Sequence, residues 1–388
     1  MDKRFISLIF LSMVFFIGCS NSSKLDSSSN TKPQKQSNAI SQSNNNLTFE
    51  KSEVYSNLLM VNKTTGWIVR NNVVLRTING GLDWNDVSPY SNSKTNDTQS
   101  IVSTYFYDSN IAWVSFGNDL NDGNKLIVYH TTDGGGHWEK ESLPAIEDWE
   151  GTGNENINFI DPSNGFILVT SQPALGQMNK SIYKTNNGGK SWLRIGTITN
   201  KIPSYPTGLT FKNSREGWIT SSNHGENYIT TFKTDDGGYS WHKENLQMVP
   251  VYKDYYTNSY PPVFLNNEKK FGILPIEYVN EKSRFIIPYI TNDGGNSWTA
   301  TKSLSNYDLS HYDFINEKQW LAIDNKENKL YETSNGGNSF EELSQNEIFK
   351  GIKTLDFISN QIGWAIGDNF FIKTIDGGKN WTKININK

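Results

Sequence analysis

The sequence predicts an all-β fold, a seven-bladed β-propeller of four-stranded antiparallel blades, and two observations predict it. The first is a pattern, Thr-x-Asp/Asn-Gly-Gly-x-x-Trp/Phe, that occurs seven times, beginning at Thr77, Thr131, Thr185, Thr234, Thr291, Thr333 and Thr374. The second is that short runs rich in β-branched and aromatic residues lie between the copies, while no long stretch has the apolar spacing of a helix. The copies lie 41 to 57 residues apart, which fits four strands per repeat and repeats that stack around a shared core.

Each copy of the pattern, called a box below, is predicted to be the turn between the third and fourth strands of a blade. Two consecutive Gly residues allow positive φ angles in the turn at no steric cost. The Asp or Asn side-chain oxygen is expected to accept backbone N–H groups inside the turn. The aromatic residue that ends the box then opens the fourth strand and packs over the turn.

The third residue of the box, which is Asp or Asn, indicates whether the box has a structural or a catalytic role. The residues at this position are Asn79, Asp133, Asn187, Asp236, Asp293, Asn335 and Asp376. Asn keeps the acceptor oxygen of Asp and loses its charge, which a general acid, a nucleophile or a ligand for a hard metal ion would need. The seven boxes are therefore interpreted as turn caps, with no catalytic role.

The other strands follow from aromatic residues upstream of each box. The first strand of a repeat ends in Phe or Met and the second opens with an aromatic residue about seven positions later. The pairs are Met60 and Trp67, Phe106 and Trp113, Phe159 and Phe166, Phe211 and Trp218, Phe314 and Trp320, and Phe357 and Trp364. The fifth repeat departs from this spacing, with Phe264 well before Gly272. The last repeat is complete within the C-terminal segment, and Leu47–Glu50 are a candidate extra strand where the ring closes.

The boxes resemble the Asp-box, or bacterial neuraminidase repeat, whose pattern is Ser/Thr-x-Asp-x-Gly-x-x-Trp. The extra Gly and the upstream Gly-Trp resemble more closely the propellers of the photosystem II assembly/stability factor type. The resemblance implies a propeller over residues 47–388. Within that family it implies assembly or stability work on other proteins. Sialidases, xyloglucanases and non-catalytic scaffolds also carry such boxes, so the resemblance leaves the function open.

The N-terminus is predicted to be an export signal. Lys3 and Arg4 precede an apolar run that is short for a membrane span, and the run ends in Phe16-Ile17-Gly18-Cys19. This ending resembles a bacterial lipobox, which makes residues 1–18 a lipoprotein signal peptide and Cys19, the only Cys, the lipidated residue. The alternative is an ordinary cleaved signal in which Cys19 is incidental. Residues 20–46 are Ser/Asn-rich and lack aromatic residues, so 19–46 are predicted to be a disordered tether.

Composition limits the partners that the protein is expected to have. The formal net charge is −4 and no basic stripe is visible, so nucleic-acid binding is not expected. The five His residues show no paired metal-ligand spacing, and no cofactor or metal is expected. The expected environment is the outer face of the bacterial cell membrane, with the lipid as the membrane contact and a protein or glycan as the unidentified partner.

Ligand-binding candidates are expected on the face of the disc opposite the boxes, where loops are free to vary. The candidates are Trp149, Tyr255, Tyr256, Tyr260, Asp119 and Asp122. Trp149 stands out because the other eleven Trp residues fit the blade pattern, six in boxes and five on second strands. Aromatic rings beside carboxylates suit a sugar or a peptide segment. The alternative is that these aromatic residues only fold their own loops onto the disc.

Two functions from different classes remain after the chemistry is considered. Sialidases grip a carboxylate with three Arg residues, and here only Arg70 and Arg284 are expected near the loop side, so that triad cannot be assembled. The favoured hypothesis is a non-catalytic, membrane-anchored binding or assembly module. The alternative is a glycoside hydrolase at the cell surface, because a pair of catalytic carboxylates on the loops is compatible with the sequence.

Overall fold

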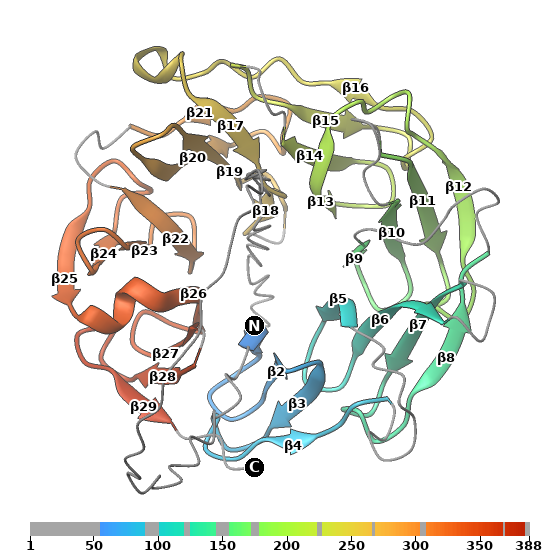
Figure 1. Cartoon of the computed structure of the whole chain (residues 1–388), viewed down its shortest axis with the longest axis horizontal. Helices are drawn as coiled ribbons and strands as arrows, with labels where there is room; N and C mark the ends of the chain where they lie inside the picture. The colour runs from blue at the N-terminus through green and yellow to red at the C-terminus, as the bar shows by residue number, and fades with distance from the viewer. Residues whose placement is uncertain are drawn as a thin grey trace, which may run out of the picture. The chain divides into compact units, whose positions relative to one another are not determined.

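The computed structural model describes residues 55–89, 101–119, 125–144, 155–171, 178–222, 227–265, 268–302, 308–367 and 369–384, all of which belong to one compact unit. These residues form seven antiparallel blades that follow one another around a ring (Figure 1). The predicted fold class is therefore confirmed. Cys19, the tether and Leu47–Glu50 lie outside the described residues, so the predicted domain boundaries stay predictions.

The first three blades each form a separate four-stranded sheet. Blade 1 contains β1 (Tyr55–Met60), β2 (Gly66–Arg70), β3 (Val73–Thr77) and β4 (Asn85–Asp86). Blade 2 contains β5 (Ile101–Phe106), β6 (Ala112–Asp119), β7 (Lys125–Thr131) and β8 (Glu139–Ser142). Blade 3 contains β9 (Glu155–Phe159), β10 (Gly165–Thr170), β11 (Lys180–Thr185) and β12 (Leu193–Thr197).

Blades 4 and 5 are joined into one nine-stranded sheet. Blade 4 contains β13 (Tyr205–Phe211), β14 (Gly217–Ser222), β15 (Thr231–Thr234) and β16 (His242–Lys243). Blade 5 contains β18 (Val263–Phe264), β19 (Gly272–Val279), β20 (Arg284–Thr291) and β21 (Thr299–Ala300). The extra strand is β17 (Tyr256–Ser259), which pairs with β19 and meets β14 at Ser222 and Asn258. A short 3₁₀ helix, η2 (Pro250–Tyr252), precedes it.

The last two blades are again separate sheets, and within the described residues no strand is exchanged between blades 7 and 1. Blade 6 contains β22 (Leu309–Phe314), β23 (Trp320–Asp324), β24 (Lys329–Thr333) and β25 (Glu341–Gln345). After the 3₁₀ helix η3 (Glu347–Gly351), blade 7 contains β26 (Ile352–Phe357), β27 (Gly363–Gly367), β28 (Phe371–Thr374) and β29 (Thr382–Ile384). The prediction that the C-terminal segment completes the last blade is confirmed. No helix in the described part of the chain has the length and apolar character needed to cross a bilayer.

All seven boxes have the same hydrogen bonds, whether they contain Asp or Asn. The Thr hydroxyl donates to the Asp or Asn Oδ1 at 2.7 to 3.0 Å and accepts the N–H of the second Gly at 2.9 to 3.0 Å. The first Gly donates its N–H to the turn between the first two strands of the same blade. These turns and the boxes therefore share one face, the box face, and the remaining connections form the opposite loop face.

The second Gly of a box is required by packing as well as by its backbone conformation. Both Gly residues of every box have positive φ angles. In addition, a Cβ atom at Gly295 would lie 2.4 Å from the ring of Trp218 on the preceding blade. At Gly189 it would lie 3.0 Å from Nε1 of Trp113, again on the preceding blade. At these seams a larger residue would push neighbouring blades apart, whereas a Cβ atom at Gly337 would meet Trp320 of its own blade at 2.5 Å. Packing therefore adds to the backbone reason for a second Gly.

The hydrophobic core is divided among the seams between neighbouring blades. Trp67 of blade 1 stacks on Phe106 of blade 2, with ring centroids 5.3 Å apart. At the closing seam, Trp364 and Phe371 of blade 7 pack in one cluster with apolar residues of blade 1. The indole N–H of Trp364 also donates to the Gly80 carbonyl oxygen at 3.0 Å. Apolar packing and box contacts therefore hold blades 7 and 1 together, and no strand of the described residues is shared between them.

Polar side chains on the innermost strands also bridge the seams. In three blades the residue before the Phe that ends this strand accepts a backbone N–H from the next blade. Asn158 accepts from Phe211 at 2.9 Å, Asp313 accepts from Phe357, and Asp356 accepts from Met60 across the closing seam. The same position thus uses an amide at one seam and carboxyls at two others.

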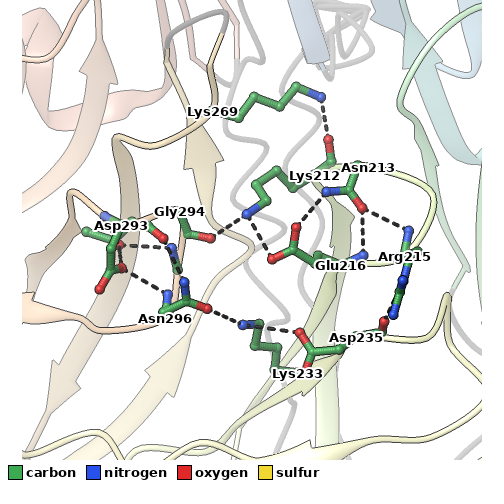
Figure 2. A network of polar contacts seen from close by, with 12 residues as sticks. Lys212, Asn213, Arg215, Glu216, Lys233, Asp235, Lys269, Asp293, Gly294 and Asn296 are labelled. Carbon is green, nitrogen blue, oxygen red and sulfur yellow. Dashed lines mark hydrogen bonds and ion pairs between the residues drawn. The ribbon is translucent and has the colours of Figure 1, made fainter.

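The box side of the seam between blades 4 and 5 contains a network of charged groups (Figure 2). Lys212 donates to the Gly294 carbonyl oxygen at 2.7 Å and to Glu216 Oε1 at 3.0 Å. Lys233 donates to Asn296 Oδ1 at 3.0 Å. Both ammonium groups therefore join blade 4 to the box of blade 5. Together with β17 on the loop side, they fasten these two blades at both ends of their seam.

We predict that the box tolerates loss of charge and not loss of the acceptor oxygen. Asp236→Asn should leave the free energy of unfolding nearly unchanged, because Asn makes the same contacts in three other boxes. Asp236→Ala should lower it by about 1 kcal/mol, as loss of a turn acceptor does elsewhere. Thermal melts of both variants check this. If Asn were as damaging as Ala, the charge would matter and the turn-cap interpretation would fail.

We also predict that the carboxyls at the seams make stability depend on pH. Burial raises the pKa of Asp356 to about 7, and burial and Asp356 raise that of Asp313. An unfolded carboxyl loses its proton near pH 4, so the folded state binds more protons between about pH 4 and 7 and loses stability as the pH rises through this range. Asp356→Asn should therefore raise the melting temperature at pH 8, by an amount equivalent to about 1–2 kcal/mol, and change it little at pH 4.

The matched control is the reverse change at the equivalent position of blade 3. Asn158→Asp should lower the melting temperature more at pH 8 than at pH 4, because it introduces a carboxyl where an amide now stands. Parallel pH profiles for the wild type and Asp356→Asn would contradict the explanation.

Candidate functional site

The candidate site lies on the loop face of blade 5, where the inserted strand β17 aligns polar side chains with those of β19 and β20. In the pairing of β17 with β19, Asn258 lies opposite Glu277 and Tyr256 lies opposite Val279. In the pairing of β19 with β20, Val279 lies opposite Arg284. Because side chains alternate along a strand, these residues share one face of the sheet. The connection between blades 4 and 5 therefore builds a surface that a plain four-stranded blade would lack.

Glu277 is the centre of this polar cluster. Its side chain is buried, and its Oε2 accepts a hydrogen bond from Asn258 Nδ2 at 2.6 Å and from the Tyr260 hydroxyl at 3.1 Å. Its other oxygen, Oε1, lies 3.4 Å from Nε of Arg284. A buried carboxylate needs such partners, and here they fix β17 and the start of β20 relative to β19.

Arg284 is the exposed member of the cluster. Its side chain is 63% exposed, whereas that of Glu277 is 8% exposed. Within the described residues it forms an ion pair with Glu277 through Nε, and most of its side chain is accessible to solvent. A guanidinium held in this way is suited to bidentate pairing with a planar anion such as a carboxylate.

The three candidate Tyr residues have different environments. Tyr256 is 50% exposed at the rim of the sheet. Tyr255 is half-buried and its ring packs against Tyr252 and Phe285, with centroids 5.2 and 5.7 Å away. Tyr260 is half-buried and donates to Glu277. These contacts favour a structural contribution from Tyr255 and Tyr260 and leave Tyr256 as the accessible ring.

The Tyr260–Glu277 contact is suited to holding the site together rather than to nucleophilic chemistry. Burial, followed by the charge of Glu277, raises the pKa of the Tyr260 phenol well above its usual range. The phenol therefore stays protonated at neutral pH and acts as a donor, whereas a nucleophilic Tyr needs its proton removed. No group of three or more His, Cys, Asp or Glu residues within the described ranges is arranged to hold a metal ion.

The other candidates lie partly or wholly outside the described residues. Trp149 and Asp122 are outside them, as is Cys19. Asp119 is the last residue of β6, and its backbone lies opposite that of Lys125 on β7. Glu155 begins β9 shortly after Trp149, and burial raises the pKa of its carboxyl to about 8 while the adjacent Ser115 lowers it. Near neutral pH this carboxyl is therefore protonated and is suited to donating a hydrogen bond.

Two residues of the site were not among the sequence candidates. Glu277 is the acidic residue inside the buried strand GILPIEYV, and an acidic residue in such a run is a signal for a satisfied buried carboxylate. Arg284 was expected near the loop face, and the structure places it there, at the start of β20. Their pairing was not predictable, because it depends on how β19 and β20 align.

Comparisons with known proteins support the fold. No protein-family model matches the sequence. A segment of 119 residues is 29% identical to a protein named "Photosystem II assembly lipoprotein Ycf48" from Synechococcus sp. (strain CC9902). The match covers 31% of this chain and 31% of that protein, so it spans about a third of the relative's length.

Three solved structures show the same fold at low sequence identity. A structure of YCF48 bound to D1 peptide has a TM-score of 0.55 at 15% identity, covering 84% of this chain and 93% of that one. YCF48 from Cyanidioschyzon merolae has a TM-score of 0.52 at 15% identity, covering 84% and 96%. A structure from an analysis of two prolyl endopeptidases has a TM-score of 0.53 at 8% identity, covering 86% and 49%. The fold thus occurs in proteins with different roles, and it does not by itself assign one.

We predict that Tyr255 and Tyr256 have separable effects. Tyr255→Ala should lower the free energy of unfolding by about 2 kcal/mol, because its ring packs against two others. Tyr256→Ala should change it by less than about 0.5 kcal/mol and should weaken partner capture. Thermal melts and capture assays on the same preparations measure both effects. Tyr239→Ala, an exposed Tyr on the box face, is the control and should change neither. A large loss of stability in Tyr256→Ala would remove it from the site.

Proposed function

We propose that this chain is a non-catalytic, lipid-anchored propeller outside the bacterial cell membrane that binds a protein partner on its loop face and assists its assembly. The observation that carries the proposal is the exposed Arg284, held by the buried Glu277 beside the accessible ring of Tyr256. Such an arrangement offers an anion-binding group and an apolar surface, and burial and Glu277 keep the phenol of the neighbouring Tyr260 protonated. It is suited to recognition rather than to turnover.

The similarity to Ycf48 supports the same class of function. The relative is named as an assembly lipoprotein, and a propeller of this fold has been solved with a peptide bound. From these proteins we carry over protein binding and lipid anchoring, and not the photosystem itself. The basic n-region, apolar run and Cys19 of this chain support the anchor.

The proposal predicts a lipid on Cys19 and capture of a protein at the membrane. The full-length protein should partition into detergent and should cross-link to a partner in intact cells. Cys19→Ala should abolish the lipid mass and should block processing or release the protein, whereas Ser28→Ala in the tether should behave as the wild type. Mass spectrometry and cross-linking with membrane fractionation measure these outcomes.

The same preparations separate this proposal from the hydrolase alternative. Purified protein is incubated with chromogenic glycosides, and the expected result is no turnover together with protein capture. Turnover of a glycoside by the wild type, with no protein captured, would replace the proposal by the glycoside hydrolase.

A further inference from the structure

The geometry points to the chemistry of the partner: we propose that the loop face of blade 5 binds an extended peptide segment whose carboxylate pairs with Arg284 and whose apolar side chain packs against Tyr256. This inference rests on the proposed function and adds to it the class of ligand and the residues that recognise it. The argument depends on the orientation of Arg284, on the charges around it and on the spacing between Arg284 and Tyr256.

The orientation of Arg284 is set before a ligand arrives. Glu277 engages Nε, and Glu277 is itself held by Asn258 and Tyr260 at 2.6 and 3.1 Å. An isolated Arg on a surface loses considerable side-chain entropy when it binds. Here that cost is reduced, because a buried carboxylate already holds one edge of the guanidinium. The outer nitrogens then present two parallel donors, which match the two oxygens of a carboxylate.

The charges around Arg284 leave its outer edge available to an anion. The carboxylate of Glu277 is 8% exposed and is already engaged with its three partners, so a ligand meets the guanidinium first. The nearest exposed charges in sequence are Glu281 and Lys282, which have opposite signs. An anionic partner is therefore attracted by Arg284 with little net contribution from the adjacent turn.

The spacing of the rim residues fits an extended peptide. Tyr256, Val279 and Arg284 lie in one row across three neighbouring strands. Neighbouring strands are about 4.8 Å apart, so Tyr256 and Arg284 are separated by about 10 Å at the backbone. An extended peptide advances about 3.3 Å per residue, so about three residues span this distance. The row can therefore bind a carboxylate at one end and an apolar side chain at the other.

The test uses fluorescein-labelled libraries of short random peptides and thermally checked protein. One library has free C-terminal carboxylates, its twin is C-terminally amidated, and two further libraries repeat these forms without Asp or Glu. The wild type should prefer peptides that have a carboxylate. Preference for the free C-terminus in the libraries without Asp or Glu would identify the chain end as the source, and its absence there would identify a side chain.

Substitutions at the site should remove this preference. Arg284→Gln should weaken binding of carboxylate peptides about tenfold or more and change binding of their amide counterparts little. Arg284→Lys keeps the charge and loses the fork, so it should weaken binding several-fold. Arg215→Gln on the box face is the matched control and should bind as the wild type does. Because Arg284 is exposed, its variants are expected to fold, and their melting curves verify this.

Failure of this inference can be distinguished from failure of the proposed function. If Arg284→Gln kept the carboxylate preference, or if the wild type bound amides equally well, the inference would be wrong. It would also be wrong if Arg284→Gln lost binding to anionic phospholipid vesicles and not binding to carboxylate peptides. Capture of the cellular partner by Arg284→Gln at wild-type levels would overturn the inference and leave protein binding in place, whereas no capture by the wild type would overturn the proposed function.

Discussion

The structure depends on close contact between the box of one blade and the large side chain of the blade before it. Trp113 and Trp218, which are fully buried, pack against the second Gly of the following box. At six of the seven boxes the second Gly faces a side chain of the preceding blade, and in blade 6 it faces Trp320 of the same blade. Among the residues that the structure describes, no strand passes between blades 7 and 1. At this seam the described contacts are apolar packing and the hydrogen bond from Trp364 to Gly80. A Cβ atom at the second Gly would open the contact, which is why conformational freedom alone does not account for this residue.

Polar side chains also connect neighbouring blades from one repeated position. One site on the innermost strand is Asn158 in blade 3 and Asp313 and Asp356 in blades 6 and 7. Each provides an oxygen for the backbone of the next blade, so the amide and the carboxyl are equivalent as acceptors. They differ in protonation, because a buried carboxyl resists losing its proton. A carboxyl at this position therefore keeps an acceptor oxygen for the next blade, and we expect it to make the stability of the ring depend on pH.

The candidate site uses a departure from the repeat. Blades 4 and 5 share a sheet because β17 enters between them on the loop side, while Lys212 and Lys233 tie them on the box side. A strand paired to a seam that is fastened at both ends is a more rigid support for recognition than a free loop is. Glu277 extends this rigidity to Arg284, so the exposed cation is oriented by buried partners. The repeats thus provide the scaffold, and an irregular connection provides the recognition surface.

The all-β class, the seven blades and the role of the boxes as turns could be predicted from the amino-acid sequence. This was possible because a turn with two Gly residues and an Asx acceptor is a local structure, and seven local copies leave few global arrangements. The sequence also placed Arg284 near the loop face, since position within a blade follows from distance to the box. That Tyr255 is packed while Tyr256 is accessible depends on tertiary structure, because Tyr255 lies just before β17 against Tyr252 and Phe285, whereas Tyr256 opens the strand at its exposed rim. Tertiary structure alone also paired Glu277 with Arg284, because the register between two strands depends on packing and turn geometry that no single residue encodes.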